Sequence, residues 1–425
     1  MKHTRANHLT LVIKNVIWLL SERGLQIALS LFVGGLIARA FGPDLYGKWQ
    51  YAISLLFIAT TLTHVCSAEV IVPKLVRQPD TAGAILGTAF VIRAAASVAG
   101  FIVGQLIVYI WIKDEEVAGF IRIILLLLLF IEPFSVVTAW FQSRTHIAPV
   151  VKIRLAVLAV KSLAITAIFF FSVKNLLVAV AWVGEGVLVM LLLLILYRRA
   201  LGPSWRVSRS KIRNYLKEGV AYWVGLLFMC IFMRLDRFFL AESVGFNSLG
   251  IYSAAIQISE NWFVLAGILS QSIAPRFIYS NISRETIDKN IQRLLILYVA
   301  LAVFGSIILA MLAPMIIGLI FGSSYEGAIH ILRYTAFVSI GVFVDSLFNI
   351  LMLKEHAAIW VGAKWIAVLS VAFLVNYLFI PVLGLQAPIL ALFVGYGVAS
   401  LIGMVYWLLW RRRSQNLNST GEVRP

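Results

Sequence analysis

The chain has 425 residues, of which 61% are hydrophobic and only 13% are charged, whereas soluble proteins average roughly 45–50% apolar and about 25% charged residues. This composition excludes a soluble fold, because a soluble fold could not hide so much apolar surface. The formal charge of +17 would suit nucleic-acid binding. However, most basic residues lie in short loops between apolar segments, as expected for a membrane protein, so we expect no nucleic-acid partner.

Apolar segments long enough to cross a bilayer recur along almost the whole chain. A membrane-spanning helix needs about 20 mainly apolar residues, and about twelve segments meet this requirement. The first six occupy residues 16–40, 46–72, 84–111, 117–141, 150–172 and 176–197. The second six occupy residues 219–241, 250–275, 291–321, 328–353, 359–380 and 387–410. The sequence therefore predicts an all-α integral membrane protein.

The basic segment 198–217 separates the two sets of spans. We expect an N-terminal six-helix bundle over 1–197, a cytoplasmic linker over 198–217, a C-terminal six-helix bundle over 218–410 and a cytoplasmic tail over 411–425. Lys and Arg concentrate in alternate loops, including the linker and the tail, whereas the opposite loops hold few bases and the acidic segment 114–116. By the positive-inside rule, both termini are expected in the cytoplasm. An even number of spans agrees with this orientation.

The two sets of spans share short stretches of similar sequence. The end of the first span matches the end of the seventh, and the loop after the fourth span matches the loop after the tenth. The paired positions are Gly42 and Gly245, Gly47 and Gly250, Ala52 and Ala255, and His146 and His356. Many transporters are built from repeats of this kind. The matches indicate two parallel six-helix halves.

Ionisable residues inside the predicted spans are functional candidates, because each costs roughly 2.5–3.5 kcal/mol to insert unless it is paired or faces water. The candidate bases of a substrate-binding cavity are Arg23, Arg93, Lys161, Arg234 and Arg237. The candidate acids, for ion coupling or structural pairing, are Glu22, Glu132, Glu185, Asp236, Glu260 and Asp345. A guanidinium group binds phosphate oxygens through two parallel hydrogen bonds, so these arginines suit a pyrophosphate. Structural ion pairs between helices are the alternative for each residue.

Motifs for catalysis, metals and cofactors are lacking. Residues 42–48 have the spacing of a phosphate-binding loop, but Trp49 replaces the required Ser or Thr and the segment joins two spans. The six histidines show no metal-ligand spacing. We therefore expect a protein that is not an enzyme and holds neither a metal nor a cofactor.

Three stretches together resemble a known family. They are residues 38–47 (ARAFGPDLYG), residues 235–241 (LDRFFLA) and residues 249–260 (LGIYSAAIQISE). With the number and layout of the spans, they resemble the Wzx-type flippases of polysaccharide and O-antigen biosynthesis. This family belongs to the superfamily of multidrug, oligosaccharidyl-lipid and polysaccharide exporters.

The resemblance implies two six-helix bundles around a central cavity that opens alternately to each side of a bacterial inner membrane. The implied cargo is an undecaprenyl-pyrophosphate-linked oligosaccharide, an O-antigen or exopolysaccharide repeat unit, which moves from the cytoplasmic to the periplasmic leaflet. Arg23, Arg234 and Arg237 are similar to the charges that the family places in spans one and seven. A gradient of H⁺ or Na⁺ would supply the energy, and a polysaccharide polymerase would use the product.

Two other functions remain open. A multidrug-type exporter of small amphipathic substrates would share this architecture, but the many intramembrane arginines disfavour a cationic substrate. A polytopic polysaccharide polymerase or glycosyltransferase would need a larger extramembrane loop than 198–217, which lacks a pair of carboxylates for sugar chemistry.

Overall fold

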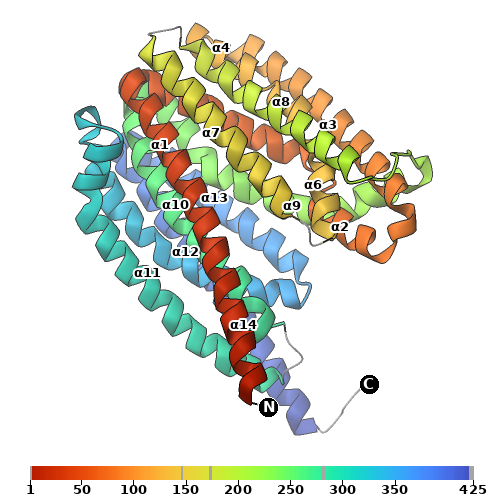
Figure 1. The fold of residues 1–425 in the computed structure, drawn as a ribbon. Coiled ribbons are helices and arrows are strands. Elements are labelled where there is room, and N and C mark those ends of the chain that lie inside the picture. The colour runs from red at the N-terminus through yellow and green to blue at the C-terminus, as the bar shows by residue number, and fades with distance from the viewer. Residues whose placement is uncertain (1, 145–146, 172–174, 280–282, 421–425) are drawn as a thin grey trace. The chain divides into compact units, whose positions relative to one another are not determined.

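The computed structural model describes the backbone of residues 2–144, 147–171, 175–279 and 283–420, and side chains between residues 24 and 412 with gaps. This part of the chain contains α-helices, two short 3-10 helices and no β-strand (Figure 1). The first eight α-helices are α1 (Lys2–Thr63), α2 (Ala68–Arg77), α3 (Ala82–Trp111), α4 (Glu115–Ile124), α5 (Leu127–Ile131), α6 (Ser135–Ser143), α7 (Ala148–Phe170) and α8 (Leu176–Arg199). The later helices are α9 (Arg209–Ser243), α10 (Gly245–Phe277), α11 (Arg284–Ile320), α12 (Ala328–Lys354), α13 (Ala358–Leu383) and α14 (Gln386–Thr420).

The predicted all-α membrane fold is confirmed. Within the described residues, nine segments are long and apolar enough to cross a membrane, counting residues 26–63 of α1 and the segment 115–143 once each. The helices α9 and α10 are not among these nine, which were sought in the described residues alone. Even so, both helices form where the sequence predicts spans seven and eight.

Two predicted spans are interrupted. The span predicted at 46–72 ends at Thr63, and the short helix α2 begins at Ala68. The span predicted at 117–141 is divided into α4, α5 and α6. The last of these breaks coincides with Pro133, which has no N–H group and whose ring cannot be accommodated in a regular helix. Continuous hydropathy does not reveal such breaks, because it measures polarity and not backbone geometry.

The chain divides by its internal packing into two compact units. The central unit is Leu36–Gly250, and the terminal unit combines Met1–Gly35 with Ile251–Pro425. In the central unit α7 lies against α8, whereas in the terminal unit α11 lies against α12 and α13 against α14 (Figure 1). The predicted division into bundles at 1–197 and 218–410 follows the repeat and stays a prediction.

Hydroxyl groups join the buried faces of the terminal unit. Ser259 of α10 and Thr335 of α12 are hydrogen-bonded over 2.7 Å, and Ser306 of α11 donates to the carbonyl of Ala336 over 2.7 Å. Small hydroxyl residues are common between membrane helices because they allow close approach and supply hydrogen bonds. They fix α12 between its neighbours.

The matched glycines of the two sequence repeats share their backbone geometry. Gly42 interrupts α1 with a φ of 69°, and Gly245 at the start of α10 has a φ of 85°. Glycine adopts these positive φ values without the steric cost of a Cβ atom. The pairing of Gly42 with Gly245 therefore corresponds to two positions with a positive φ.

A second glycine pair forms a reciprocal contact inside the central unit. A Cβ atom added to Gly47 would collide with the carbonyl oxygen of Phe246, and one added to Gly250 would collide with the carbonyl oxygen of Pro43. Phe246 and Pro43 occupy matching places in the two repeats. The two turns therefore pack backbone against backbone, related by local two-fold symmetry.

We predict that Gly47→Ala lowers the stability of the protein by about 1–3 kcal/mol, the usual cost of overpacking, because backbone atoms cannot move aside. The melting temperature of purified protein in detergent measures the change. The matched control is Gly184→Ala in α8, where an added Cβ has no neighbour within 4 Å. Equal melting temperatures for the two variants would contradict the close contact.

Candidate functional site

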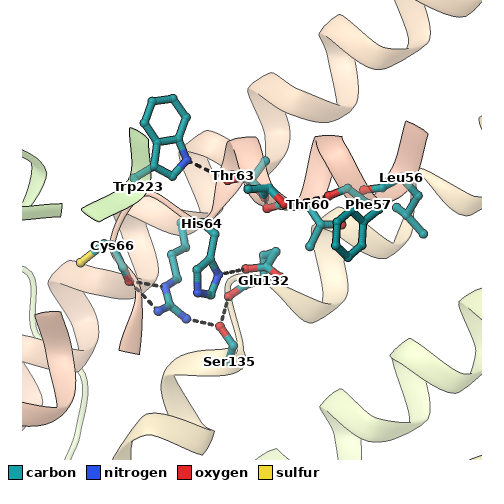
Figure 2. A network of polar contacts seen from close by, with 11 residues as sticks. Leu56, Phe57, Thr60, Thr63, His64, Cys66, Glu132, Ser135 and Trp223 are labelled. Carbon is teal, nitrogen blue, oxygen red and sulfur yellow. Dashed lines mark hydrogen bonds and ion pairs between the residues drawn. The ribbon is translucent and has the colours of Figure 1, made fainter. Parts of the chain in front are cut away.

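A polar network surrounds the interruption between α1 and α2 in the central unit (Figure 2). Arg93 of α3, which is only 1% exposed, donates from Nε and Nη2 to the carbonyl oxygen of Cys66 over 2.8 and 2.5 Å. Its Nη1 atom donates to the hydroxyl of Ser135 at the start of α6. Arg93 therefore supplies hydrogen bonds to two places where the helical ladder is broken. These contacts favour a structural role for Arg93.

A histidine and a carboxylate meet in the same network. The Nδ1 atom of His64 lies 2.8 Å from Oε2 of Glu132, and Glu132 is 5% exposed (Figure 2). The hydroxyl of Ser135 donates to the backbone carbonyl of Glu132 over 2.5 Å. An imidazole paired with a carboxylate can take up and release a proton, so this pair suits the coupling role predicted for Glu132. Sequence reasoning missed His64, because the two residues are 68 positions apart.

The helix α9 carries the predicted cluster of charges and runs along the second part of α1. The indole of Trp223 donates to the carbonyl of Thr61 over 2.8 Å (Figure 2). Further along, the guanidinium of Arg234 lies 4.4 Å from the centre of the Phe57 ring. This cation–π contact holds a half-buried arginine against the face of α1.

Asp236 and Arg237 are more deeply buried than Arg234. Arg237 is 2% exposed and donates from Nη1 to the carbonyl of Met233 over 2.9 Å. Its Nη1 atom also lies 3.7 Å from Oδ1 of Asp236, an ion pair inside the central unit. Arg234 is therefore the more accessible of the two predicted arginines.

Lys161 of α7 pairs with Glu185 of α8. The Nζ and Oε2 atoms are 2.5 Å apart, and Nζ also lies 3.9 Å from the centre of the Trp182 ring. Both candidate residues are thus brought together, in an arrangement that joins two adjacent helices. The contact favours structural pairing for Glu185.

The terminal unit contains a buried pair of its own. Asp345 of α12 lies 2.6 Å from Nζ of Lys364 on α13, and the Lys364 side chain is fully buried. Nζ also donates to Oδ1 of Asn349 over 3.3 Å. Lys364 was not among the candidate bases predicted from the sequence. Its place inside the predicted span 359–380, close to Trp365, was the signal that could have identified it as a buried base.

The remaining candidates are Glu260, Glu22 and Arg23. Glu260 lies half-buried on α10. Glu22 and Arg23 lie outside the residues whose side chains are described. No group of three or more His, Cys, Asp or Glu that could hold a metal ion occurs among the described residues.

An ionic cluster joins Lys48, near the start of the second predicted span, to the predicted acidic loop. Lys48 lies 2.9 Å from Asp114 and 2.8 Å from Glu116. Burial alone would raise the pKa of Asp114, but the N–H of Val117 and the ammonium of Lys48 together hold this pKa below its usual value. The resulting stabilisation is present above the ordinary carboxyl pKa and is lost as the pH falls through the lowered value.

Comparison with known proteins gives one family and one fold. Residues 12–279 match the family model described as polysaccharide biosynthesis protein. None of the curated protein sequences compared with the chain matches it.

Several solved membrane proteins are similar in fold. The lipid II flippase MurJ, in an inward closed conformation, has a TM-score of 0.71 and 11% identity, covering 92% of this chain and 87% of its own. An inward-facing multidrug resistance MATE transporter has a TM-score of 0.65 and 14% identity, covering 92% and 96%. A MOP superfamily transporter from Pyrococcus furiosus with a reversed polarity of its binding pocket has a TM-score of 0.65 and 12% identity, covering 96% of each chain. These similarities establish the fold.

We predict that Lys364→Met lowers the stability by about 3–5 kcal/mol, because it leaves the Asp345 carboxylate buried without its partner. The double variant Asp345→Leu with Lys364→Met should recover most of this loss, as measured by melting temperature in detergent. The matched control is Lys289→Met, which removes an ion pair to Glu285 whose side chains are 62% and 69% exposed. A loss no greater than in this control would show that the buried pair contributes little.

Proposed function

Because the chain belongs to the polysaccharide biosynthesis protein family, we propose that it is a flippase for an undecaprenyl-pyrophosphate-linked oligosaccharide, such as an O-antigen or exopolysaccharide repeat unit. It is a multi-pass membrane protein of a transporter family and not an enzyme. In this proposal the saccharide moves by alternating access from the cytoplasmic to the periplasmic leaflet of a bacterial inner membrane, and a polymerase then uses it. The lipid chain stays in the bilayer while the polar head crosses through the protein.

The observation that carries the proposal is the half-buried guanidinium of Arg234 on α9. Arginines inside membrane spans are rare and often mark a substrate pathway, and a planar guanidinium is well suited to the oxygens of a pyrophosphate. The MurJ structure, which shares the fold, is that of a flippase for a lipid-linked substrate. Arg237 and Arg23 are the other bases proposed to act on the phosphate.

We propose that the central unit couples transport to an ion gradient. The His64–Glu132 pair joins the interruption after α1 to the segment between α5 and α6, and its carboxylate is almost fully buried. A proton bound there would change the charge of the network that Arg93 holds together. We therefore favour H⁺ over Na⁺ as the coupling ion.

The arginines distinguish this function from multidrug export. We predict that Arg234→Ala with Arg237→Ala abolishes surface polysaccharide while the protein still accumulates in the membrane. Loss of the charge removes the phosphate contact, whereas a small cationic drug would be exported no less efficiently. Surface polysaccharide is measured by gel electrophoresis of cell-envelope extracts, and membrane accumulation by immunoblot. The control is Arg122→Ala on the exposed face of α4, and normal polysaccharide in the double variant would refute the assignment.

The proposed orientation has a separate test. Alkaline phosphatase fused after Trp111 should be active, because this point follows three predicted spans and lies in the periplasm. The same fusion after Lys217 should be inactive, because the basic linker is predicted in the cytoplasm. An active enzyme at the second position would reverse the predicted direction of the chain.

A further inference from the structure

A cavity of about 300 Å³ with several polar side chains in its wall lies between α10 and α12 in the terminal unit. None of the residues assigned above to phosphate binding or ion coupling lines it. The residues of its wall are Gly267, Ser270, Gln271, Ala274, Tyr279, Ser346, Asn349, Ile350 and Leu353. Its volume is at the lower end of the roughly 300–1,000 Å³ typical of small-molecule sites. The cavity is therefore large enough for one small polar group and not for a whole oligosaccharide.

The cavity wall combines neutral hydrogen-bonding groups, one aromatic ring and the aliphatic side chains of Ala274, Ile350 and Leu353. Ser270, Gln271, Ser346 and Asn349 offer hydroxyl and amide groups that both donate and accept, and Tyr279 adds a phenol. Among the residues that the structure describes, no Lys, Arg, Asp or Glu lines the cavity. A neutral wall of this kind is suited to the hydroxyl groups of a sugar and poorly suited to a phosphate or a cation.

Two contacts behind the wall hold its polar groups in place. Asn349 accepts a hydrogen bond from Lys364, whose ammonium is fixed in turn by Asp345 over 2.6 Å. The hydroxyl of Ser270 lies 3.1 Å from the hydroxyl of Tyr298 on α11. Polar groups fixed in this way lose little freedom when a ligand binds, which favours binding.

An apolar groove in the same unit provides a contrast. This groove runs along α11 and is lined by Leu295, Ile296, Val299, Ala300, Val303, Phe304 and Ile307. Hydrophobic side chains form its entire wall, as expected where a helix faces lipid. Hydrogen-bonding groups therefore distinguish the cavity between α10 and α12 from a lipid-facing surface.

The position of the cavity fits the start of transport. Tyr279 follows the end of α10 and Leu353 is next to the end of α12. Both helix ends lead into loops that the charge pattern predicts to be cytoplasmic. A saccharide assembled on the cytoplasmic face would meet this part of the unit before it crosses the membrane.

We propose that this cavity binds a single sugar ring of the lipid-linked saccharide during loading from the cytoplasmic leaflet, an inference that rests on the proposed flippase function. The amide and hydroxyl side chains bond to the sugar hydroxyls, and the Tyr279 ring packs against the face of the sugar. Lys364 and Asp345 are positioning residues, because they act through Asn349. The cavity thereby selects cargo by its sugar, whereas Arg234 recognises the phosphate.

Filling the cavity tests this proposal in cells. An added Cβ at Gly267 has no neighbour within 4 Å, so Gly267→Leu extends into the cavity without displacing the backbone. We expect surface polysaccharide to fall at least tenfold, with the variant still present in the membrane by immunoblot. The matched control is Gly397→Leu on α14, which also has no neighbour within 4 Å and should leave polysaccharide unchanged. Normal polysaccharide with Gly267→Leu would overturn the proposal.

Cysteine protection tests occupancy directly and needs no loss of function. The native Cys66 and Cys230 are buried, so a new thiol in Ser346→Cys can be labelled selectively with a maleimide in inside-out vesicles. One set of vesicles comes from cells that accumulate their lipid-linked saccharide because they lack the polymerase. The other set comes from cells that lack the glycosyltransferase adding its first sugar.

We expect labelling of Ser346→Cys to be at least threefold slower in the saccharide-containing vesicles. Glu355→Cys, just beyond α12 and outside the cavity wall, should be labelled equally in both. Equal labelling at Ser346→Cys would reject the sugar site. A different result would refute the proposed flippase function itself. Cells that lack the protein would then make normal surface polysaccharide and accumulate no lipid-linked saccharide.

Discussion

The hydrocarbon of a bilayer offers no hydrogen bonds, so every polar group of the chain within it must find a partner inside the protein. Most of the backbone meets this demand by forming helices. Where the ladder breaks between Thr63 and Ala68, the guanidinium of Arg93 bonds to the free carbonyl of Cys66. The same demand explains why Lys161 and Lys364 each lie within 2.6 Å of a carboxylate. Charge inside this protein is thus first a means of joining helices.

The sequence predicted those features of the fold that depend on a single local property of the chain. Hydropathy locates the spans, and Gly42 and Gly245 could be matched because each turn needs a residue without a Cβ atom. The interruption after Thr63 could not be predicted, because residues 64–72 remain largely apolar and only packing shows where the helix stops. The partners of the ionisable residues were equally hidden, since His64 meets Glu132 and Asp345 meets Lys364 across different helices. Sequence therefore identified candidate charges but not which of them neutralise each other.

The ion pairs between helices also indicate which charged residues are available to bind a substrate. The ammonium of Lys364, which is fully buried and held by Asp345, is poorly placed to bind a phosphate. Arg234 is less deeply buried, and its guanidinium lies over the ring of Phe57. In the proposed mechanism a lipid-linked saccharide is recognised in two chemically distinct ways. Permanent positive charge acts on the phosphate, and neutral amides and hydroxyls act on the sugar.

The contact between Gly47 and Gly250 constrains how the two matched segments can diverge. Each glycine lies against backbone of the other segment, so a larger side chain at one position cannot be accommodated by shortening a side chain at the other. At most packed pairs, a larger residue at one position can be offset by a smaller residue at the other. No such compensating substitution is possible at this contact. Although 203 positions separate them in the sequence, the two glycines form a single steric requirement. The two segments can therefore lose resemblance almost everywhere else and still keep the smallest residue at this point.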